Sequence, residues 1–210
     1  MNRRDLIKGV VGVIPGALAV ELLTARFAFA QAGDFASPLD VLNYALVLEY
    51  LENEYYRQAR ATGLLAGVEA DQVARIAADE QAHVAALTTI IADLGGTPQP
   101  QPAVDFGAAF ASRESLLETA FRFENSCMQG YLGAGAHIFG EKELVAAALS
   151  IYGVEARHAA LIGLMAGKPA AGGVFKGPVE TPYTRQQVYD DVGGFFTEPG
   201  VVSGRAARTT

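Results

Sequence analysis

The sequence predicts an all-α protein with one folded domain. The chain has 210 residues, of which 50% are hydrophobic, and this is enough to bury one sizeable core. Trp is absent, Ala is abundant and alternating Val-rich runs are scarce, a composition that favours helices over sheets. Helix start and stop signals divide the chain into four long helical segments and a short fifth one.

The first helix is predicted over residues 38–62. Ser37 can cap its first turn, and Pro38 suits the first helical position because its missing N–H would have no partner there. Asp40 places a negative charge in the first turn, where the helix dipole favours it. Gly63 then ends the helix.

A long connection separates the second predicted helix, 70–94, from the third, 112–139. Gly95 and Gly96 end the second helix, and residues 97–102 read Thr-Pro-Gln-Pro-Gln-Pro, which is extended because proline cannot continue a helix. In a helix bundle, a long link at this point indicates a crossover. We therefore expect the third helix to run parallel to the second.

The fourth helix is predicted over 141–166 and a short fifth helix over 185–196. The apolar residues expected in the core from the fourth helix are Leu149, Leu161, Ile162 and Leu164. Thr184 and Gln187 have the spacing of a capping box, which opens the fifth helix. Phe195 and Phe196 are expected to pack this helix onto the bundle or onto a partner.

The first 30 residues are interpreted as an export signal. Arg3-Arg4 precede an apolar run, 9–20, and then Ala28-Phe29-Ala30, a small-x-small cleavage site. The paired arginines resemble a twin-arginine signal, which predicts a periplasmic or secreted protein whose mature form begins near Gln31. An uncleaved membrane anchor is the alternative, but the run is too short to span a bilayer, so no stable membrane insertion is expected after cleavage. The predicted segments are a signal at 1–30, a linker at 31–36, the helical domain at 37–196 and a flexible tail at 197–210.

Charge and cysteine content exclude several functions. The net charge is −7 and no basic cluster follows residue 8, which argues against a nucleic-acid surface, because phosphate binding needs a basic stripe. Cys127 is the single cysteine. It excludes an intrachain disulfide, a zinc site built from several thiolates and a Cys-x-x-Cys redox or rubredoxin-type module.

A Glu-x-x-His frame occurs twice, at Glu80-Gln-Ala-His83 and at Glu155-Ala-Arg-His158. Residues three apart on a helix lie on one face, so each frame can direct a carboxylate and an imidazole to one point. The frames are 75 residues apart, and the same interval relates Glu49 to Glu124 and Tyr56 to Tyr131. This internal repeat consists of metal-ligand residue types.

The repeat also chooses between neighbouring candidates. Glu49 and Glu52 lie one turn apart, but Glu49 has a glutamate at the repeat interval, whereas Glu52 corresponds to Cys127. Glu52 is therefore kept as an outer or alternative ligand. His137 falls outside the repeat, near the end of the third helix, where a histidine interacts favourably with the helix dipole.

Four long helices carrying Glu, Glu-x-x-His, Glu and Glu-x-x-His in that order resemble the ferritin-like superfamily of di-iron and di-manganese carboxylate proteins. The chain is also similar to ferritin-like proteins related to desiccation-associated proteins of plants and bacteria. This similarity rests on the predicted exported N-terminus and on the segment of the first helix that reads Leu-Asn-Tyr-Ala-Leu-Val-Leu-Glu-Tyr-Leu-Glu-Asn-Glu-Tyr-Tyr. The resemblance covers residues 37–196. The second Glu-x-x-His points towards bacterioferritins, rubrerythrins and manganese catalases rather than cage-forming ferritins.

The resemblance implies a ferritin-like four-helix bundle that binds two divalent metal ions, Fe or Mn. The implied metal ligands are Glu49, Glu80, His83, Glu124, Glu155 and His158. Glu80 and Glu155 would bridge the ions, and each histidine would bind one of them. Tyr56 and Tyr131 would hydrogen-bond the carboxylates from outside the ligand set.

Three functions follow from this interpretation. The first is a di-metal oxidoreductase acting in stress protection, whose partner is a small oxidant, peroxide or oxygen, or Fe(II). The second is a protein that sequesters metal without turnover, and the third is a structural stress or desiccation protein with an idle site. Assembly as a homodimer is left open.

Overall fold

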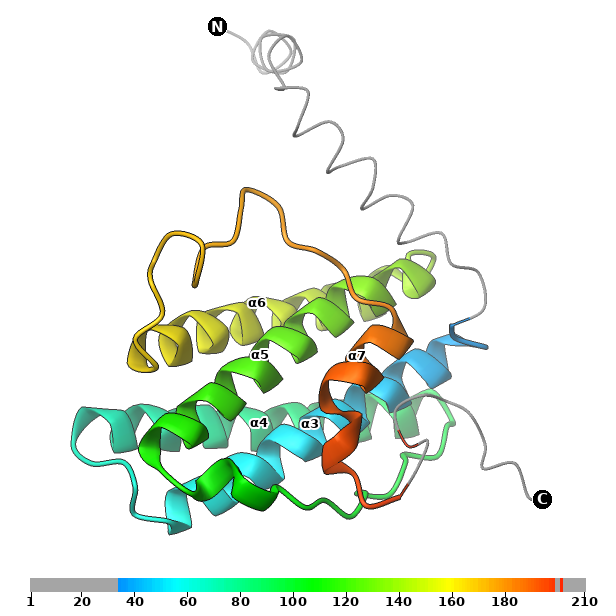
Figure 1. Ribbon diagram of the computed structural model, residues 1–210. Coiled ribbons are helices and arrows are strands. Elements are labelled where there is room, and N and C mark those ends of the chain that lie inside the picture. The colour runs from blue at the N-terminus through cyan, green and yellow to red at the C-terminus, as the bar shows by residue number, and fades with distance from the viewer. Residues whose placement is uncertain (1–33, 199–200, 202–210) are drawn as a thin grey trace, which may run out of the picture.

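The computed structural model describes residues 34–198 and 201, and this part of the chain is mostly helical (Figure 1). The long helices are α3 (Pro38–Ala61), α4 (Val68–Asp93), α5 (Arg113–Gly135) and α6 (Lys142–Met165). The short elements are α7 (Arg185–Val192) and the 3₁₀ helices η1 (Gly107–Phe110), η2 (Ala136–Ile138) and η3 (Gly193–Phe195). Within the described residues, β-structure is limited to two isolated bridges. The predicted all-α fold is confirmed, while the predicted signal at 1–30 and most of the predicted tail lie outside the described residues.

The helix ends follow the capping residues. The Ser37 hydroxyl accepts a hydrogen bond from the N–H of Asp40, and Gly63 adopts φ 70° just beyond α3. Thr184 and Gln187 form the predicted capping box at the start of α7. Two ends differ from the prediction, because the segments predicted to end at residues 139 and 196 leave the α-helical conformation at Gly135 and Val192 and continue as single 3₁₀ turns.

The helices form two antiparallel pairs, α3 with α4 and α5 with α6 (Figure 1). The proline-containing connection between α4 and α5 returns along the bundle, so that α5 runs parallel to α4 as predicted. Asn43 of α3 holds this connection by accepting a hydrogen bond from the N–H of Gln99 at 2.7 Å and donating one to the carbonyl of Thr97 at 3.3 Å. The crossover places α3 and α5 side by side.

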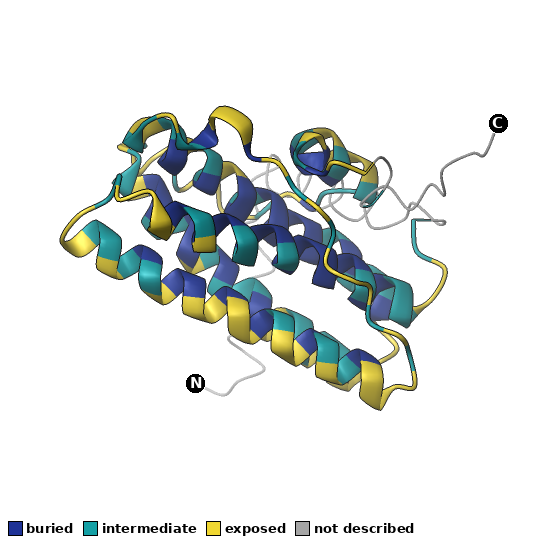
Figure 2. Cartoon of the chain, turned by 90° about the horizontal axis from the view of Figure 1, so that it is seen from below, coloured by how far each residue is buried: buried dark blue, intermediate teal, exposed yellow. Residues whose placement is uncertain are grey.

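Helix α3 is largely buried, because it packs against α4, α5 and η2 in the interior of the molecule (Figure 2). At its C-terminal end Tyr55 contacts the aromatic rings of Phe106, Phe110 and Phe123 at centroid distances of 5.0–5.1 Å. Phe195 of η3 packs edge-on against Phe123 at 4.8 Å. The C-terminal aromatic residues therefore pack onto the bundle itself.

For two of the four residues of the fourth helix that were expected in the core, the prediction of burial is wrong. Ile162 is buried, but Leu149 and Leu164 are each 57% exposed. Helix α6 packs mainly on α5, and each of these leucines lies two residues, or about 200°, from the inward-facing Ile151 or Ile162. By length and composition α6 could also cross a membrane, which for one helix is weak evidence of a span.

Gly133 of α5 allows the segment before α7 to approach closely. A Cβ atom at this position would lie 1.8 Å from the carbonyl oxygen of Tyr183, which is a backbone atom and cannot move aside on its own. The same segment is tied to α5 because the N–H of Tyr183 donates to the carbonyl of Gln129 at 3.0 Å. The glycine is therefore needed for docking of the C-terminal segment.

We expect Gly133→Ala to lower the free energy of unfolding by about 1 to 3 kcal/mol, the usual cost of overpacking. Gly153→Ala in α6 is the matched control, because a Cβ there meets no heavy atom within 4 Å and should stabilise the helix by about 1 kcal/mol. Urea unfolding of both variants measures the difference. Equal stabilities would contradict the close approach of the Tyr183 carbonyl.

Candidate metal centre

The four long helices each direct carboxylate side chains into the middle of the bundle. Helix α3 supplies Glu49 and α5 supplies Glu124, while α4 and α6 supply the two Glu-x-x-His frames. All four glutamates, Glu49, Glu80, Glu124 and Glu155, have 0% of their surface exposed, and His83 and His158 have 8% and 5%. The structure thus brings together all six residues that the sequence singled out.

These six residues form two overlapping groups of four. One group contains Glu49, Glu80, His83 and Glu155, and the other contains Glu80, Glu124, Glu155 and His158. Within each group the potential ligand atoms all lie within 4.8 Å of one another. Because Glu80 and Glu155 belong to both groups, their carboxylates lie where they can be shared by two ions.

Both imidazoles face the carboxylates with the same ring nitrogen. Nδ1 of His83 lies 3.0 Å from Glu155, 3.1 Å from Glu49 and 3.4 Å from Glu80. Nδ1 of His158 lies 2.9 Å from Glu80, 3.4 Å from Glu124 and 3.7 Å from Glu155. Each nitrogen therefore approaches three carboxylates at once, although a neutral imidazole nitrogen can serve only one hydrogen bond well.

Several of these atoms have no hydrogen-bond partner. They include His158 Nδ1, Glu80 Oε1, Glu124 Oε2 and both carboxylate oxygens of Glu155. Buried polar atoms are almost always paired, and here they converge at short distances without hydrogen-bond geometry. Nitrogen and carboxylate oxygen are ligands for divalent transition metals, so the donor set fits metal ions.

The two tyrosines act across the bundle. Tyr131 of α5 donates to Oε1 of Glu49 on α3 at 2.5 Å, and Tyr56 of α3 donates a short hydrogen bond to Oε1 of Glu124 on α5. Each tyrosine thus serves the glutamate of the other half of the repeat, not the one seven residues before it. Because α3 and α5 are antiparallel, the tyrosine of each helix lies beside the glutamate of the other.

A comparison with protein-family models matches residues 37–168 to the ferritin-like domain. The chain belongs to the ferritin-like family. A search of curated proteins found no match. The match ends just after α6 and therefore includes the whole of the four-helix bundle with all six buried residues.

Asp79 is a residue of this ferritin-like centre that the sequence analysis missed. Its Oδ2 lies 3.2 Å from Nε2 of His158, on the side of the ring away from the carboxylates. A hydrogen bond there keeps the proton on Nε2 and leaves Nδ1 free to face the centre. The repeat could not reveal it, because the position equivalent to Asp79 in the second half is Val154.

The other candidate residues lie outside the two groups of four. His137 is in η2, and its ring packs edge-on against Phe35 at 5.0 Å between centroids. Glu52 and Cys127 are buried next to Glu49 and belong to neither group of four, although all three residues lie together. The repeat interval therefore distinguishes Glu49 from Glu52 in the same way as the geometry does.

Burial and mutual repulsion determine the protonation of the metal-free centre. Burial and the Glu155 carboxylate raise the pKa of Glu80 to about 8, and burial likewise raises the pKa of Glu49 and Glu124. Burial lowers the pKa of His83, but the three carboxylates close to its ring, those of Glu155, Glu49 and Glu80, outweigh this and raise it to about 12. Burial raises the pKa of Glu155, but the close approach of both histidine rings outweighs this and lowers it to about 2.

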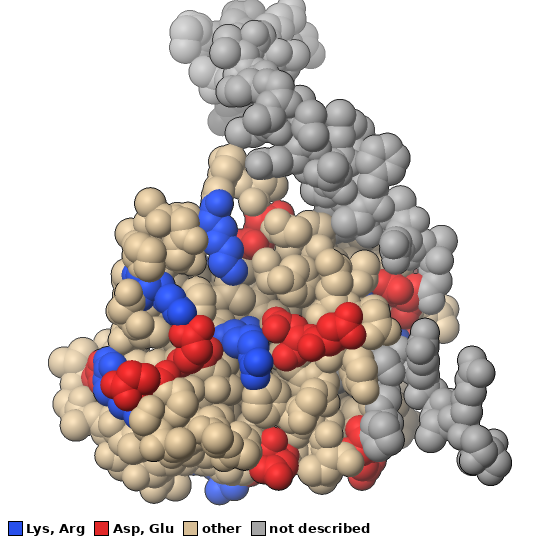
Figure 3. All heavy atoms as spheres, viewed as in Figure 1, with Lys and Arg blue, Asp and Glu red and all other residues tan. Residues whose placement is uncertain are grey.

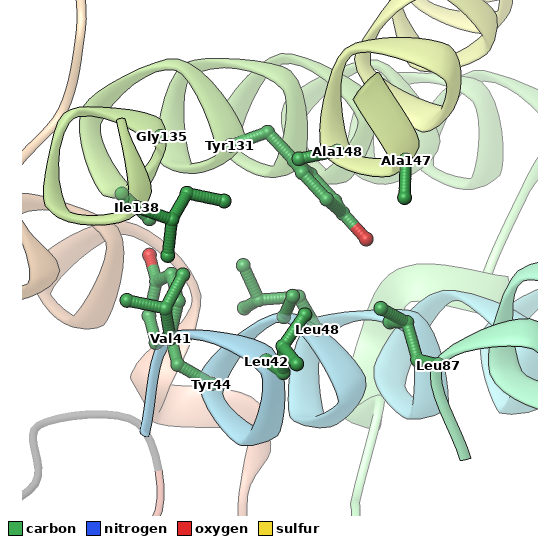
Figure 4. A pocket seen from close by; sticks show the side chains of 12 residues that line it. Val41, Leu42, Tyr44, Leu48, Leu87, Tyr131, Gly135, Ile138, Ala147 and Ala148 are labelled. Atoms are coloured by element: carbon green, nitrogen blue, oxygen red, sulfur yellow. The ribbon is translucent and has the colours of Figure 1, made fainter. Parts of the chain in front are cut away.

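An apolar pocket adjoins the centre at one end of the bundle (Figure 4). Tyr131 extends from α5 into this space, which Leu48 of α3, Leu87 of α4 and Ala148 of α6 also line. The volume in which the centre of a water-sized molecule can lie is about 20 Å³, which is room for about one water-sized molecule. Because the Tyr131 hydroxyl also contacts Glu49, the pocket lies directly beside the carboxylate cluster.

The metal-free protein should lose stability as the pH rises from about 5 to about 8. Folded Glu80 and His83, with pKa values of about 8 and about 12, keep protons that the unfolded chain, with ordinary values of 4.5 and 6.5, releases in this range. Glu155 adds no pH dependence there, because its lowered pKa of about 2 affects stability only below its ordinary value of 4.5. Urea unfolding of chelator-treated protein at several pH values measures the trend.

Metal-loaded protein is the control for this experiment. Metal ions replace the protons, so the loaded form should be stabilised relative to the metal-free form by an amount that grows with pH. A metal-free protein whose stability stays constant or increases over this range would contradict the predicted protonation of the centre.

Proposed function

We propose that this chain is an exported ferritin-like protein that binds two divalent ions, iron or manganese, and carries out redox chemistry with a small oxidant or with Fe(II) in stress protection. The observation that carries the proposal is the pair of overlapping groups that share Glu80 and Glu155. In this assignment Glu49 and His83 complete one position, and Glu124 and His158 complete the other.

The charges and ligand types support this assignment. Four carboxylates supply four negative charges, which two divalent ions neutralise, and without such compensation each buried charge would cost several kcal/mol. Carboxylate and imidazole suit both iron and manganese. When bound, the two ions would supply one-electron redox chemistry towards peroxide, dioxygen or Fe(II).

The surrounding residues have positioning roles in this proposal. Tyr56 and Tyr131 hold the carboxylates of Glu124 and Glu49 in place through their hydrogen bonds. Asp79 holds His158 with Nδ1 turned inward. The apolar pocket beside Tyr131 supports a small uncharged oxidant as the partner, since its lining offers little to a charged molecule.

The surface charges support a small-molecule partner over a nucleic acid. On the face shown in Figure 3, Lys and Arg side chains are interspersed with Asp and Glu and form no basic stripe. The net charge of −7 would also repel phosphate groups.

Metal analysis tests the proposed centre. After loading with Fe(II) or Mn(II) without oxygen, the protein should hold two ions per chain. His83→Ala and His158→Ala should each lower the metal content, because each removes the nitrogen ligand of one position. His137→Ala is the matched control and should keep two ions, since its ring packs on Phe35 outside the centre.

Activity assays then separate the candidate functions. Glu80→Gln and Glu155→Gln should abolish peroxide consumption and Fe(II) oxidation, because each removes a carboxylate shared by both positions. Glu54→Gln is the control for these variants, as this partly buried glutamate lies outside both groups of four and pairs with the exposed Arg57 at 2.6 Å. A loaded wild-type protein no more active than free metal would refute the redox function and favour metal sequestration or a structural role.

Export is a separate part of the proposal and has its own test. Replacing Arg3 and Arg4 by Lys should leave the precursor in the cytoplasm, because twin-arginine signals depend on the arginine pair. Cell fractionation with antibody detection measures the distribution. Unchanged export of this variant would rule out the twin-arginine route.

A further inference from the structure

A third group of potential ligands lies next to the two-metal centre. It consists of Glu52 of α3, Cys127 of α5 and Glu49, whose ligand atoms lie within 4.8 Å of one another. All three residues are buried, with exposures of 1%, 2% and 0%. The function proposed above uses Glu49 but gives no role to the other two.

Glu52 is the unexplained residue of this group. Both of its carboxylate oxygens are buried and neither has a hydrogen-bond partner. A carboxyl group without partners is costly in either protonation state, because the charged form lacks a counter-charge and the neutral form has a hydroxyl that donates to nothing. A ligand between Glu52 and its neighbours would remove this cost.

Glu49 connects the third group to the two-metal centre through different oxygen atoms. Its Oε2 lies 3.1 Å from Nδ1 of His83, whereas its Oε1 accepts from the Cys127 thiol at 3.9 Å and from Tyr131 at 2.5 Å. A carboxylate oxygen has two lone pairs, so Oε1 can contact a further ion while keeping the tyrosine. The third group can therefore be occupied without displacing Glu49 from His83.

Charge identifies the missing ligand as a cation. Two divalent ions neutralise Glu49, Glu80, Glu124 and Glu155, which leaves Glu52 as an additional buried carboxyl group. None of the basic side chains in the described residues pairs with Glu52, since both of its oxygens are unpartnered. A cation would compensate Glu52 and at the same time bind the sulfur of Cys127.

The donor set selects the kind of cation. One thiolate and two carboxylates in an enclosed site suit a borderline-soft divalent ion such as Zn²⁺, whose structural and catalytic sites use sulfur and oxygen ligands at low coordination number. Manganese prefers oxygen and nitrogen ligands and is the poorer match. Because the third group favours a zinc-type ion and the two-metal centre suits iron or manganese, metal binding at the two places can be measured separately.

We propose that Glu52, Cys127 and Glu49 bind one thiophilic divalent cation of the zinc type as a third metal position beside the two-metal centre. Cys127 becomes a thiolate as the metal–sulfur bond forms, and its proton is released to solvent. The position lies between α3 and α5, the two helices that do not carry the Glu-x-x-His frames, and so it joins the two halves of the repeat.

Cobalt is a suitable probe because thiolate-bound Co²⁺ has a sulfur-to-metal charge-transfer band in the near ultraviolet. Titration of the metal-free full-length protein with Co²⁺ should produce this band, and Zn²⁺ should remove it by competition. Glu52→Gln should weaken the affinity measured from the band by about tenfold or more. Glu54→Gln, two residues away on α3 and paired with Arg57 outside the third group, is the matched control and should leave the band unchanged.

His83→Ala separates this proposal from the proposed function, because it removes a ligand from the neighbouring position but not from the third one. The band should survive this replacement with an affinity within about twofold of the wild type. If His83→Ala abolishes the band, Cys127 binds an ion of the two-metal centre and the third position does not exist. A wild-type protein without the band also overturns the proposal, and so does a band that Glu52→Gln leaves unchanged. Either result counts against the third position even where the protein binds Mn(II) in the two-metal centre.

Discussion

The burial of charge in the middle of the bundle is the constraint on which the rest of the structure depends. Four glutamates with no exposed surface share one small volume with two histidines, and burial alone would make this arrangement strongly unfavourable. In the metal-free chain, protons and imidazolium groups provide compensation, as the raised pKa of Glu80 and of His83 indicates. Two divalent ions would provide it more completely, which couples the stability of the fold to its occupancy.

The internal repeat explains how a sequence meets this constraint with few residue types. Each half contributes a glutamate, a Glu-x-x-His frame and a tyrosine, and the crossover between α4 and α5 brings the halves together in opposite directions. Tyr56 and Tyr131 therefore each hydrogen-bond a glutamate of the other half, so each half positions a carboxylate of its counterpart.

The repeat is not perfect, and its departures are informative. Asp79 fixes His158, but Val154 occupies the equivalent place in the other half, so the two imidazoles have different surroundings. Glu52 and Cys127 occupy equivalent positions yet differ in chemistry, and together with Glu49 they form a group with its own unpartnered carboxylate. The two halves can thus face one shared cluster while differing in their surroundings.

The sequence by itself determined the all-α class, the helix ends marked by Ser37, Gly63 and Thr184, and the six residues of the centre, because caps and a repeat of i,i+3 spacing are local patterns. Only the tertiary structure decided which side of α6 faces the core, since a helix of nearly uniform hydrophobicity gives no strong preference, and Leu149 and Leu164 are exposed as a result. The tertiary structure also revealed the contacts of Tyr56, Asp79 and Glu52, because these depend on which helices are antiparallel neighbours. The contacts of Tyr56 and Asp79 join residues 68 and 79 positions apart, beyond the reach of helical periodicity.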